Sequence, residues 1–186
     1  MKNLPEFKYH SNPLETGSIV KRKTDCPVCH KNQEYVYVGP FYSAEEVEGI
    51  CPWCIADGNA AKKYDGEFQD YCSIEGISPN PNESNTISYK KEDIDILISK
   101  TPGYSGWQQE VWLGHCDEPC SFEGYVGWKE IKEAGIDVEE DLDQQARMYG
   151  MTKNDFCERL QNNGSIQGYL FRCVKCGKYR LTTDCD

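Results

Sequence analysis

Two short motifs, Cys26-Pro-Val-Cys29 and Cys51-Pro-Trp-Cys54, decide the fold of this chain. Each Cys-x-x-Cys turn offers two thiolates from one tight loop, and zinc prefers four such ligands at the corners of a tetrahedron. Residues 30–50 separate the two motifs, and this spacing is close to that of zinc ribbons. The pair therefore predicts one closed, structural zinc site with four cysteine ligands.

A second quartet of cysteines lies in the C-terminal half. Its first part, Cys116-Asp-Glu-Pro-Cys120, is looser than a Cys-x-x-Cys turn, and residues 121–172 separate it from Cys173-Val-Lys-Cys176. Helices expected within residues 137–162 would account for this long insertion. We predict a second zinc ion bound by Cys116, Cys120, Cys173 and Cys176, with His115 and Cys185 as alternative ligands.

The cellular context supports metal rather than disulfides. The chain has 11 cysteines, an odd number, and its first residues lack the apolar stretch of a secretory signal. No apolar run is long enough to span a membrane. We therefore expect a cytoplasmic protein without membrane contact, in which most cysteines bind metal. Cys72 and Cys157 have no partner at a ligand-like spacing, and Cys157 is expected to be a small buried residue.

The charge balance limits the partners. Thirty-one acidic residues against 20 basic ones give a formal charge of −11, which repels nucleic acid and attracts basic proteins. Five of the seven residues in 137–143 are Asp or Glu, and we expect them on the outer face of a helix whose apolar stripe turns inward. Two basic clusters beside the cysteine motifs instead favour nucleic-acid binding. They are Lys21-Arg-Lys23, and Arg172 with Lys175, Lys178 and Arg180.

The sequence contains little that supports an enzymatic function. The chain has 3 histidines and no Ser-His-Asp, P-loop or dinucleotide-binding pattern, and four-cysteine sites leave no position for a catalytic water. A dithiol oxidoreductase would need Cys51-Pro-Trp-Cys54 in a βαβ setting, which the neighbouring Cys26 motif disfavours. Trp107, Trp112, Tyr125 and Trp128 would line a pocket in an enzyme, although such residues more often form core.

Hydrophobic periodicity and breakers predict short elements of both kinds. Strands are expected at residues 35–38 and 122–128, and a hairpin carrying the last Cys-x-x-Cys turn at 166–183. Helices are expected after the capping box Ser43-Ala-Glu-Glu46, at 54–64, around 94–98, at 107–116, at 137–148, and from Thr152 to near Gly164.

These elements predict an α+β fold built from two zinc-ribbon-like four-cysteine modules with short β-hairpins and inserted helices. We expect an N-terminal module at residues 1–76 and a C-terminal module at 101–186, each with one zinc site. The Pro-, Asn- and Ser-rich segment that begins at residue 77 predicts a linker over 77–100.

Several blocks resemble the CbrC family of bacterial colicin-tolerance proteins, over most of the chain except residues 77–100 and 137–165. The blocks are Leu4-Pro-Glu-Phe-Lys-Tyr-His10, Asn12-Pro-Leu-Glu-Thr-Gly-Ser-Ile19, Gly39-Pro-Phe-Tyr-Ser43, Cys51-Pro-Trp-Cys-Ile-Ala-Asp-Gly58, Phe68-Gln-Asp70, Thr101-Pro-Gly-Tyr104, Gly106-Trp-Gln-Gln-Glu110, His115-Cys116, Gly124-Tyr-Val-Gly-Trp128, Phe171-Arg-Cys173 and Cys176-Gly-Lys178.

The resemblance implies zinc-ribbon-like modules and a role in surviving a DNA-cleaving toxin, but no catalytic residues. We therefore expect a non-enzymatic zinc-binding protein that gives tolerance or immunity to a nuclease colicin by binding a basic protein through its acidic surface. The alternatives are a zinc-ribbon module for nucleic acid or transcription, and an uncharacterised enzyme.

Overall fold

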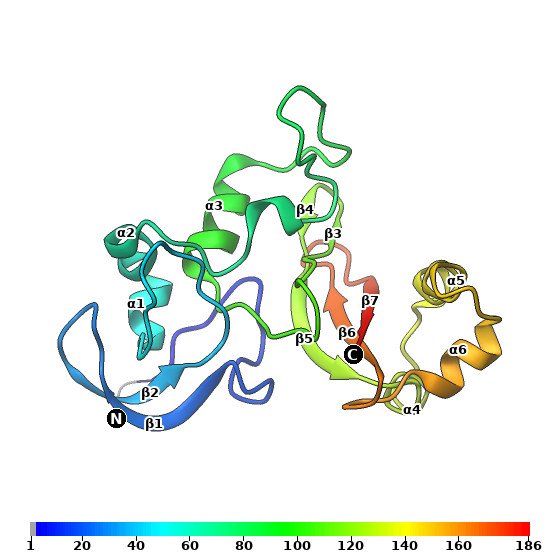
Figure 1. Ribbon diagram of the computed structural model, residues 1–186, viewed down its shortest axis with the longest axis horizontal. Helices are drawn as coiled ribbons and strands as arrows, with labels where there is room; N and C mark the ends of the chain where they lie inside the picture. The colour runs from blue at the N-terminus through cyan, green and yellow to red at the C-terminus, as the bar shows by residue number, and fades with distance from the viewer. Residues whose placement is uncertain (1–2) are drawn as a thin grey trace.

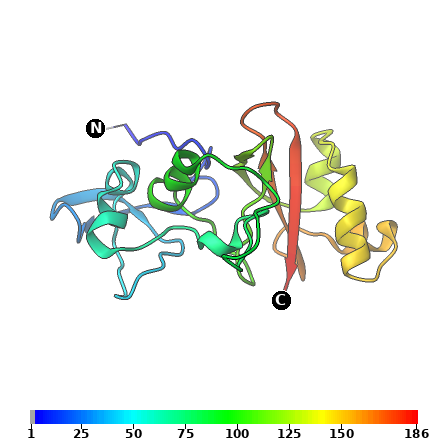
Figure 2. The ribbon, with the colours of Figure 1, turned by 90° about the horizontal axis from the view of Figure 1, so that it is seen from above.

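The computed structural model describes residues 3–186 and has a mixed α+β architecture, as the sequence predicts. Its elements form a two-stranded sheet, a short two-stranded hairpin, a three-stranded sheet and helices α1 to α6, and every strand pairing is antiparallel. Along the long axis, the β1–β2 sheet lies at one end, the three-stranded sheet follows near the middle, and α4 to α6 lie at the other end (Figures 1 and 2).

The N-terminal region is a hairpin packed against two short helices. Strand β1 (Ile19–Asp25) pairs with β2 (Asn32–Tyr37), and α1 (Pro52–Ala56) and α2 (Asn59–Tyr64) follow. The single helix expected at 54–64 is broken at Gly58, whose φ of 74° is left-handed. Ile19, Tyr37, Ile50, Ile55 and Phe68 are buried in the core that joins the hairpin to the helices.

The central region is built on a three-stranded sheet. Its strand order is β5 (Ser121–Val126), β6 (Ile166–Arg172) and β7 (Tyr179–Cys185). The fully buried rings of Tyr104 and Trp112 pack against Phe122 of β5 and Phe171 of β6. Helix α3 (Lys91–Lys100), the 3-10 turn η1 (Tyr71–Ser73) and the hairpin of β3 (Gly114–His115) and β4 (Glu118–Pro119) also belong to this region.

Three helices cover the far side of the central sheet. They are α4 (Trp128–Glu133), α5 (Glu139–Met148) and α6 (Lys153–Arg159). Their apolar residues Val138, Leu142, Ala146 and Phe156 pack with Leu181 of β7. The predicted cap of α6 is confirmed, because the Thr152 hydroxyl accepts a hydrogen bond from the Asp155 amide.

Two expected helices are absent from the described residues, and the predictions of both were wrong. Residues 43–50 run beside β2, where the Ile50 carbonyl accepts a hydrogen bond from the Tyr37 amide. Residues 107–116 are also not helical: residues 107–109 form a bend, and Gly114 and His115 form β3. The Trp107 amide donates to Asp184, and Trp112 exchanges backbone hydrogen bonds with Ser73 and Glu75. In residues 107–116 such tertiary contacts satisfy backbone groups that a helix would have paired within itself.

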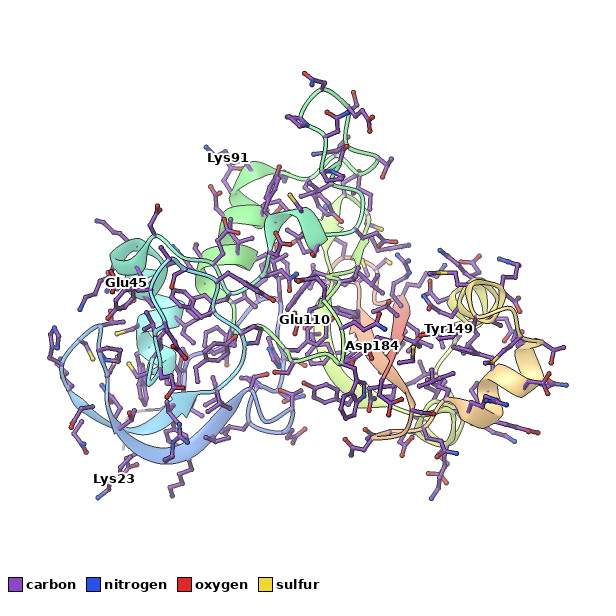
Figure 3. The ribbon with its side chains drawn as sticks, in the orientation of Figure 1. Lys23, Glu45, Lys91, Glu110, Tyr149 and Asp184 are labelled. Atoms are coloured by element: carbon purple, nitrogen blue, oxygen red, sulfur yellow. The ribbon has the colours of Figure 1, made fainter. Side chains whose placement is uncertain are left out.

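The segment expected as a linker takes part in the core. Residues 77–90 contain no helix or strand, but Ile94 and Leu97 of α3 are buried with the aromatic rings of the central region. The module boundaries stay a prediction. Glu110, labelled in Figure 3, links the regions further, because its carboxylate accepts hydrogen bonds from the Tyr42 hydroxyl and the Gly106 amide. Between residues 3 and 186, none of the helices combines the length and apolar character needed to cross a membrane.

Candidate metal centres

The first four cysteines meet at the end of the β1–β2 hairpin. Cys26 and Cys29 lie in the turn between the strands, and Cys51 and Cys54 lie at the start of α1. Their sulfur atoms are all within 4.8 Å of one another. The Sγ atoms of Cys26 and Cys54 are 3.9 Å apart, and those of Cys29 and Cys51 are 4.0 Å apart. A tetrahedral zinc ion with Zn–S bonds of about 2.3 Å has sulfur–sulfur edges of about 3.8 Å, so the four residues fit such an ion.

Local hydrogen bonds reach two of these sulfurs, those of Cys26 and Cys29. The Cys51 amide donates to the Cys26 sulfur at 3.4 Å, and the Gln33 side-chain amide donates to the Cys29 sulfur at 3.8 Å. The pKa of Cys26 falls to about 4, first because the Cys51 thiol donates to it and then because nearby backbone amides point at it. Cys26, Cys51 and Cys54 are buried, so this first centre is sealed from solvent on most sides.

A second group contains His115, Cys116, Cys173 and Cys176, and its ligand atoms also lie within 4.8 Å of one another. The His115 Nδ1 atom is 3.1 Å from the Cys116 sulfur and 3.3 Å from the Cys176 sulfur. The nitrogen–sulfur edge of a tetrahedral zinc site is about 3.6 Å. Three thiolates and one imidazole therefore form a second group that can hold a metal ion.

A tight hairpin presents two of these ligands together. His115 pairs with Glu118 across the β3–β4 ladder, which leaves Cys116 and Asp117 as a two-residue turn. Both turn residues have a φ of 56°, the left-handed conformation that a type I′ hairpin turn requires. Adjacent residues at the turn thus point toward the same metal position, an arrangement that no Cys-x-x-Cys spacing would reveal.

The placement of Cys120 corrects the predicted ligand set. Its side chain is fully buried in the central core, where burial raises the pKa of the thiol, and it is not one of the four gathered residues. The extended backbone after the hairpin fixes this orientation: the Cys120 amide donates to Leu113, and its carbonyl accepts from the Trp112 indole. His115, held open in the sequence analysis, occupies the fourth position. Cys185, the other alternative, accepts from Gln108 and lies outside the group.

The hairpin of the second centre is anchored by charged groups on both sides. Glu118 is 5% exposed and pairs with Lys8 and Lys175, while Lys175 also donates to the Cys116 carbonyl. On the other side, Arg180 donates to the Gly114 carbonyl at 2.7 Å and pairs with Asp141 and Glu75. None of these contacts uses a sulfur or imidazole atom of the second centre.

The acidic helix also differs from expectation. The carboxylates of α5 were expected on its outer face, and Glu139, Glu140 and Asp143 do reach solvent there, whereas Asp141 is buried. All four form ion pairs within the chain. Glu139 and Asp143 pair with Lys153, Glu140 pairs with Lys178, and Asp141 is buried against Arg180. The same contacts occupy two of the cations that had suggested a nucleic-acid surface.

The aromatic residues fall into two groups. Trp112 is core, whereas Trp107 is 57% exposed and lines a cavity of about 260 Å³ with Tyr125 and Tyr169. A larger cavity of about 570 Å³ adjoins the second centre and includes Lys8, Arg172 and Lys175 in its lining. The lining of the larger cavity also includes Cys173 and Cys176 of the second centre.

All 11 cysteines are free thiols, so no two of them form a disulfide. Cys72 is exposed and Cys157 is buried on α6, and neither belongs to a metal-binding group, in agreement with the absence of ligand-like spacing.

A family model described as an uncharacterised protein family, UPF0167, matches residues 4–185. UPF0167 proteins of Mycobacterium bovis and Mycobacterium tuberculosis are each 37% identical over 187 residues, covering 98% of this chain and 94% of the relative. A UPF0167 protein of Pseudomonas aeruginosa is 35% identical, with 97% of each chain covered. No solved structure gives a significant match. The family match and these full-length relatives show that the chain belongs to the UPF0167 family.

Proposed function

We propose that this protein is a non-enzymatic zinc protein that holds two zinc ions and acts by binding another protein. The observation that carries the proposal is the pair of four-ligand groups with near-tetrahedral spacing, one with four sulfurs and one with three sulfurs and a nitrogen. Such donor sets are typical of zinc, because thiolate and imidazole ligands in a tetrahedron suit it better than they suit magnesium or calcium.

The zinc ions would act as structural cross-links. Cys26 and Cys29 would tie the β1–β2 turn to α1, and His115 and Cys116 would tie the β3–β4 hairpin to the turn between β6 and β7. Four protein ligands leave no open position for a water molecule or a substrate, which is the feature of catalytic zinc sites. This closed geometry favours a structural role over an enzymatic one.

The proposed partner is a basic protein, and a DNA-cleaving colicin is the candidate that the CbrC resemblance suggests. The formal charge of −11 supports attraction to such a partner. Because the α5 carboxylates are paired within the chain, the acidic surface is better sought elsewhere. Glu45, Glu46 and Glu48 are exposed on the segment before α1, and none of them forms an ion pair with the described lysines and arginines. Glu45 is labelled in Figure 3.

The nucleic-acid alternative is supported less well. Around the last cysteine turn, Lys175, Lys178 and Arg180 each pair with a carboxylate. Phosphate contacts would have to displace those carboxylates or compete with them. The exposed run Lys21-Arg-Lys23 on β1 remains as a small basic patch in a strongly acidic molecule.

The metal part of the proposal is tested by elemental analysis of protein purified without chelator under reducing conditions. We expect close to two equivalents of zinc per chain. A value near zero in folded, reduced protein would remove the proposal, and iron in place of zinc would change the metal but keep the two centres.

The proposed binding to a basic partner is tested in cells that express the protein at low or at high copy number. These cells are challenged with a DNA-cleaving colicin. We expect wild-type protein to protect, and the triple variant Glu45→Lys, Glu46→Lys, Glu48→Lys to protect less because charge reversal slows association with a basic partner. A matched control reverses three exposed charges of the opposite sign, Lys21→Glu, Arg22→Glu, Lys23→Glu. No protection by wild type would exclude this toxin, and equal protection by all three proteins would exclude the acidic segment.

A further inference from the structure

The two metal centres differ in how much of each thiol solvent can reach. In the first centre three of the four cysteines are buried and Cys29 is half-buried. In the second centre Cys116 and Cys176 are exposed, His115 is half-exposed, and only Cys173 is buried. A small oxidant in solution therefore has direct access to two thiols of the second centre. Access and thiolate character are the features that decide which cysteines oxidise.

The two exposed thiols are also close to each other. Cys116 belongs to the β3–β4 turn and Cys176 to the turn between β6 and β7, yet both sulfurs contact the same His115 nitrogen, at 3.1 and 3.3 Å. The two sulfurs lie within 4.8 Å. A thiol that is oxidised here has a second exposed thiol beside it to complete a disulfide.

We propose that Cys116 and Cys176 form an oxidative modification site, at which a peroxide joins them in a disulfide while the first centre stays intact. The inference rests on the proposed second metal centre. Once the two sulfurs are joined, His115 and Cys173 remain as ligands, and two ligands are too few to hold a metal ion firmly.

The chemistry balances with hydrogen peroxide as the oxidant. One thiolate attacks a peroxide oxygen, the O–O bond breaks, and a sulfenic acid and hydroxide form. The second thiolate then attacks the sulfenic sulfur, the S–O bond breaks, and a second hydroxide leaves as the S–S bond forms. The two sulfurs lose two electrons, the peroxide gains them, and two protons from the buffer acid convert both hydroxides to water.

The surrounding structure allows this exchange without loss of the fold. The turn that carries Cys116 is fixed by the Glu118 pairs with Lys8 and Lys175 on one side. On the other side, Arg180 binds the Gly114 carbonyl and two carboxylates. These contacts do not involve the cysteine sulfurs. A disulfide would replace the metal as the link between the hairpin and the last cysteine turn.

The chain supplies its own controls. Cys72 is exposed but lies outside both groups, so it reports general thiol oxidation without a partner thiol. Cys26, Cys51 and Cys54 report oxidation of a buried group in the same molecule. The variant Cys72→Ser keeps both centres and removes the isolated exposed thiol.

The experiment treats the metal-loaded, full-length protein and its Cys72→Ser variant with hydrogen peroxide after the starting metal content has been measured. Released metal is followed with a chromogenic chelator, and disulfides are located by peptide mass spectrometry. We expect one of the two metal equivalents to leave, at least about tenfold faster than the other, with a Cys116–Cys176 cross-link and an unchanged far-ultraviolet circular dichroism spectrum. Thiol reductant plus zinc should restore the starting state.

Three results would overturn the inference: both metals retained with Cys116 and Cys176 still reduced, a first disulfide among the Cys26 group, or oxidation confined to Cys72. The variant Cys176→Ser gives a second check, because Cys116 then has only the buried Cys173 beside it in this group and should form a disulfide more slowly. A starting content of one metal, with the Cys26 group loaded, would instead remove the proposed second centre itself. The failures of the two proposals are thus distinguishable before oxidant is added.

Discussion

The two metal centres use the same kind of turn but stand in different surroundings. In each, the amide of the first cysteine donates to a lysine carbonyl five residues later, from Cys26 to Lys31 and from Cys173 to Lys178. In each, the residue after the second cysteine is left-handed, with φ of 55° at His30 and 76° at Gly177. The first turn meets another cysteine motif inside a core, whereas the second meets a hairpin turn at the surface.

The same Cys-x-x-Cys turn therefore contributes to a buried core in one region and to a surface site in the other. The first centre lies within the apolar cluster of the N-terminal region, and its cysteines are part of that cluster. The second centre lies at the rim of a sheet whose own core of large aromatic rings is complete without the exposed ligands. We therefore expect metal to be required for folding in the first region and to be dispensable for folding in the second.

The largest expected effect comes from removing one ligand of each centre. Cys29→Ser should unfold residues 19–64, because metal binding supplies about 10 kcal/mol or more of folding free energy in small zinc sites. Cys176→Ser should lose one metal but keep the folded central sheet. Hydrogen exchange of the two regions measures both outcomes, with Cys72→Ser as the control. If both variants lose protection to the same extent in both regions, the distinction between the centres is wrong.

A second prediction concerns the ion pairs of Arg180, which anchor the hairpin of the second centre. Arg180→Met should destabilise the protein by about 3–5 kcal/mol, because it leaves Asp141 and Glu75 without their shared partner in a largely buried site. It should also weaken metal retention at the second centre, whose hairpin it anchors. Lys178→Met is the matched control: its partner Glu140 is 83% exposed, so its loss should leave the melting curve nearly unchanged. Equal melting curves for the two variants would contradict this account.

A third prediction tests the contact between the regions. His10 is fully buried beside Phe122 of the central sheet, and its Nδ1 atom donates to the Pro102 carbonyl. Burial lowers the pKa of His10 to about 4, so the imidazole is neutral in the folded protein at neutral pH. Between that value and the unfolded value of about 6.5, the unfolded state binds more protons, so the stability should fall as the pH falls, by up to about 3 kcal/mol.

Denaturant titrations of wild type and His10→Gln across this pH range measure the effect. The difference between the two proteins isolates the histidine from the metal-binding thiols, which also gain protons in acid. The variant should show the shallower dependence on pH. A steeper dependence in His10→Gln would show that the imidazole is not held neutral.

The smallest expected effect tests whether His115 or Cys120 is the fourth ligand of the second centre. Cys120→Ala should keep both metals and cost on the order of 1 kcal/mol, since it removes a single buried sulfur from a packed core. His115→Ala should lose the metal of the second centre only. Loss of one metal by Cys120→Ala, with His115→Ala fully loaded, would restore the ligand set that the sequence first suggested.

The sequence was informative where chemistry and spacing act locally. The Cys26 and Cys51 turns, the hairpin around Cys173, and the capped helix after Thr152 follow from motifs a few residues long. The position of Cys120 does not, because it depends on a left-handed turn at Cys116 and Asp117 that reverses the chain one residue after His115. The paired state of the α5 carboxylates was equally hidden, since Lys153, Lys178 and Arg180 reach them only after the helices pack on the sheet.

The two missing helices have the same explanation. A capping pattern at Ser43 and an aromatic spacing at Trp107 and Trp112 describe what a segment prefers alone. In the folded chain, distant backbone partners bind Ile50 at the end of the first segment and Trp107 and Trp112 in the second, and neither segment is helical. Local preference is a weak guide wherever such partners are available.

The central claim is that one centre has four sulfur ligands and the other has three sulfurs and one nitrogen. It is tested most directly by cadmium NMR of the protein in which cadmium replaces the native metal, because the cadmium chemical shift distinguishes these two ligand sets. The account predicts two resonances of equal intensity, one typical of four thiolates and one typical of three thiolates with an imidazole, the latter lost in His115→Ala. Two resonances typical of four thiolates, or a single resonance in the folded wild-type protein, would contradict it.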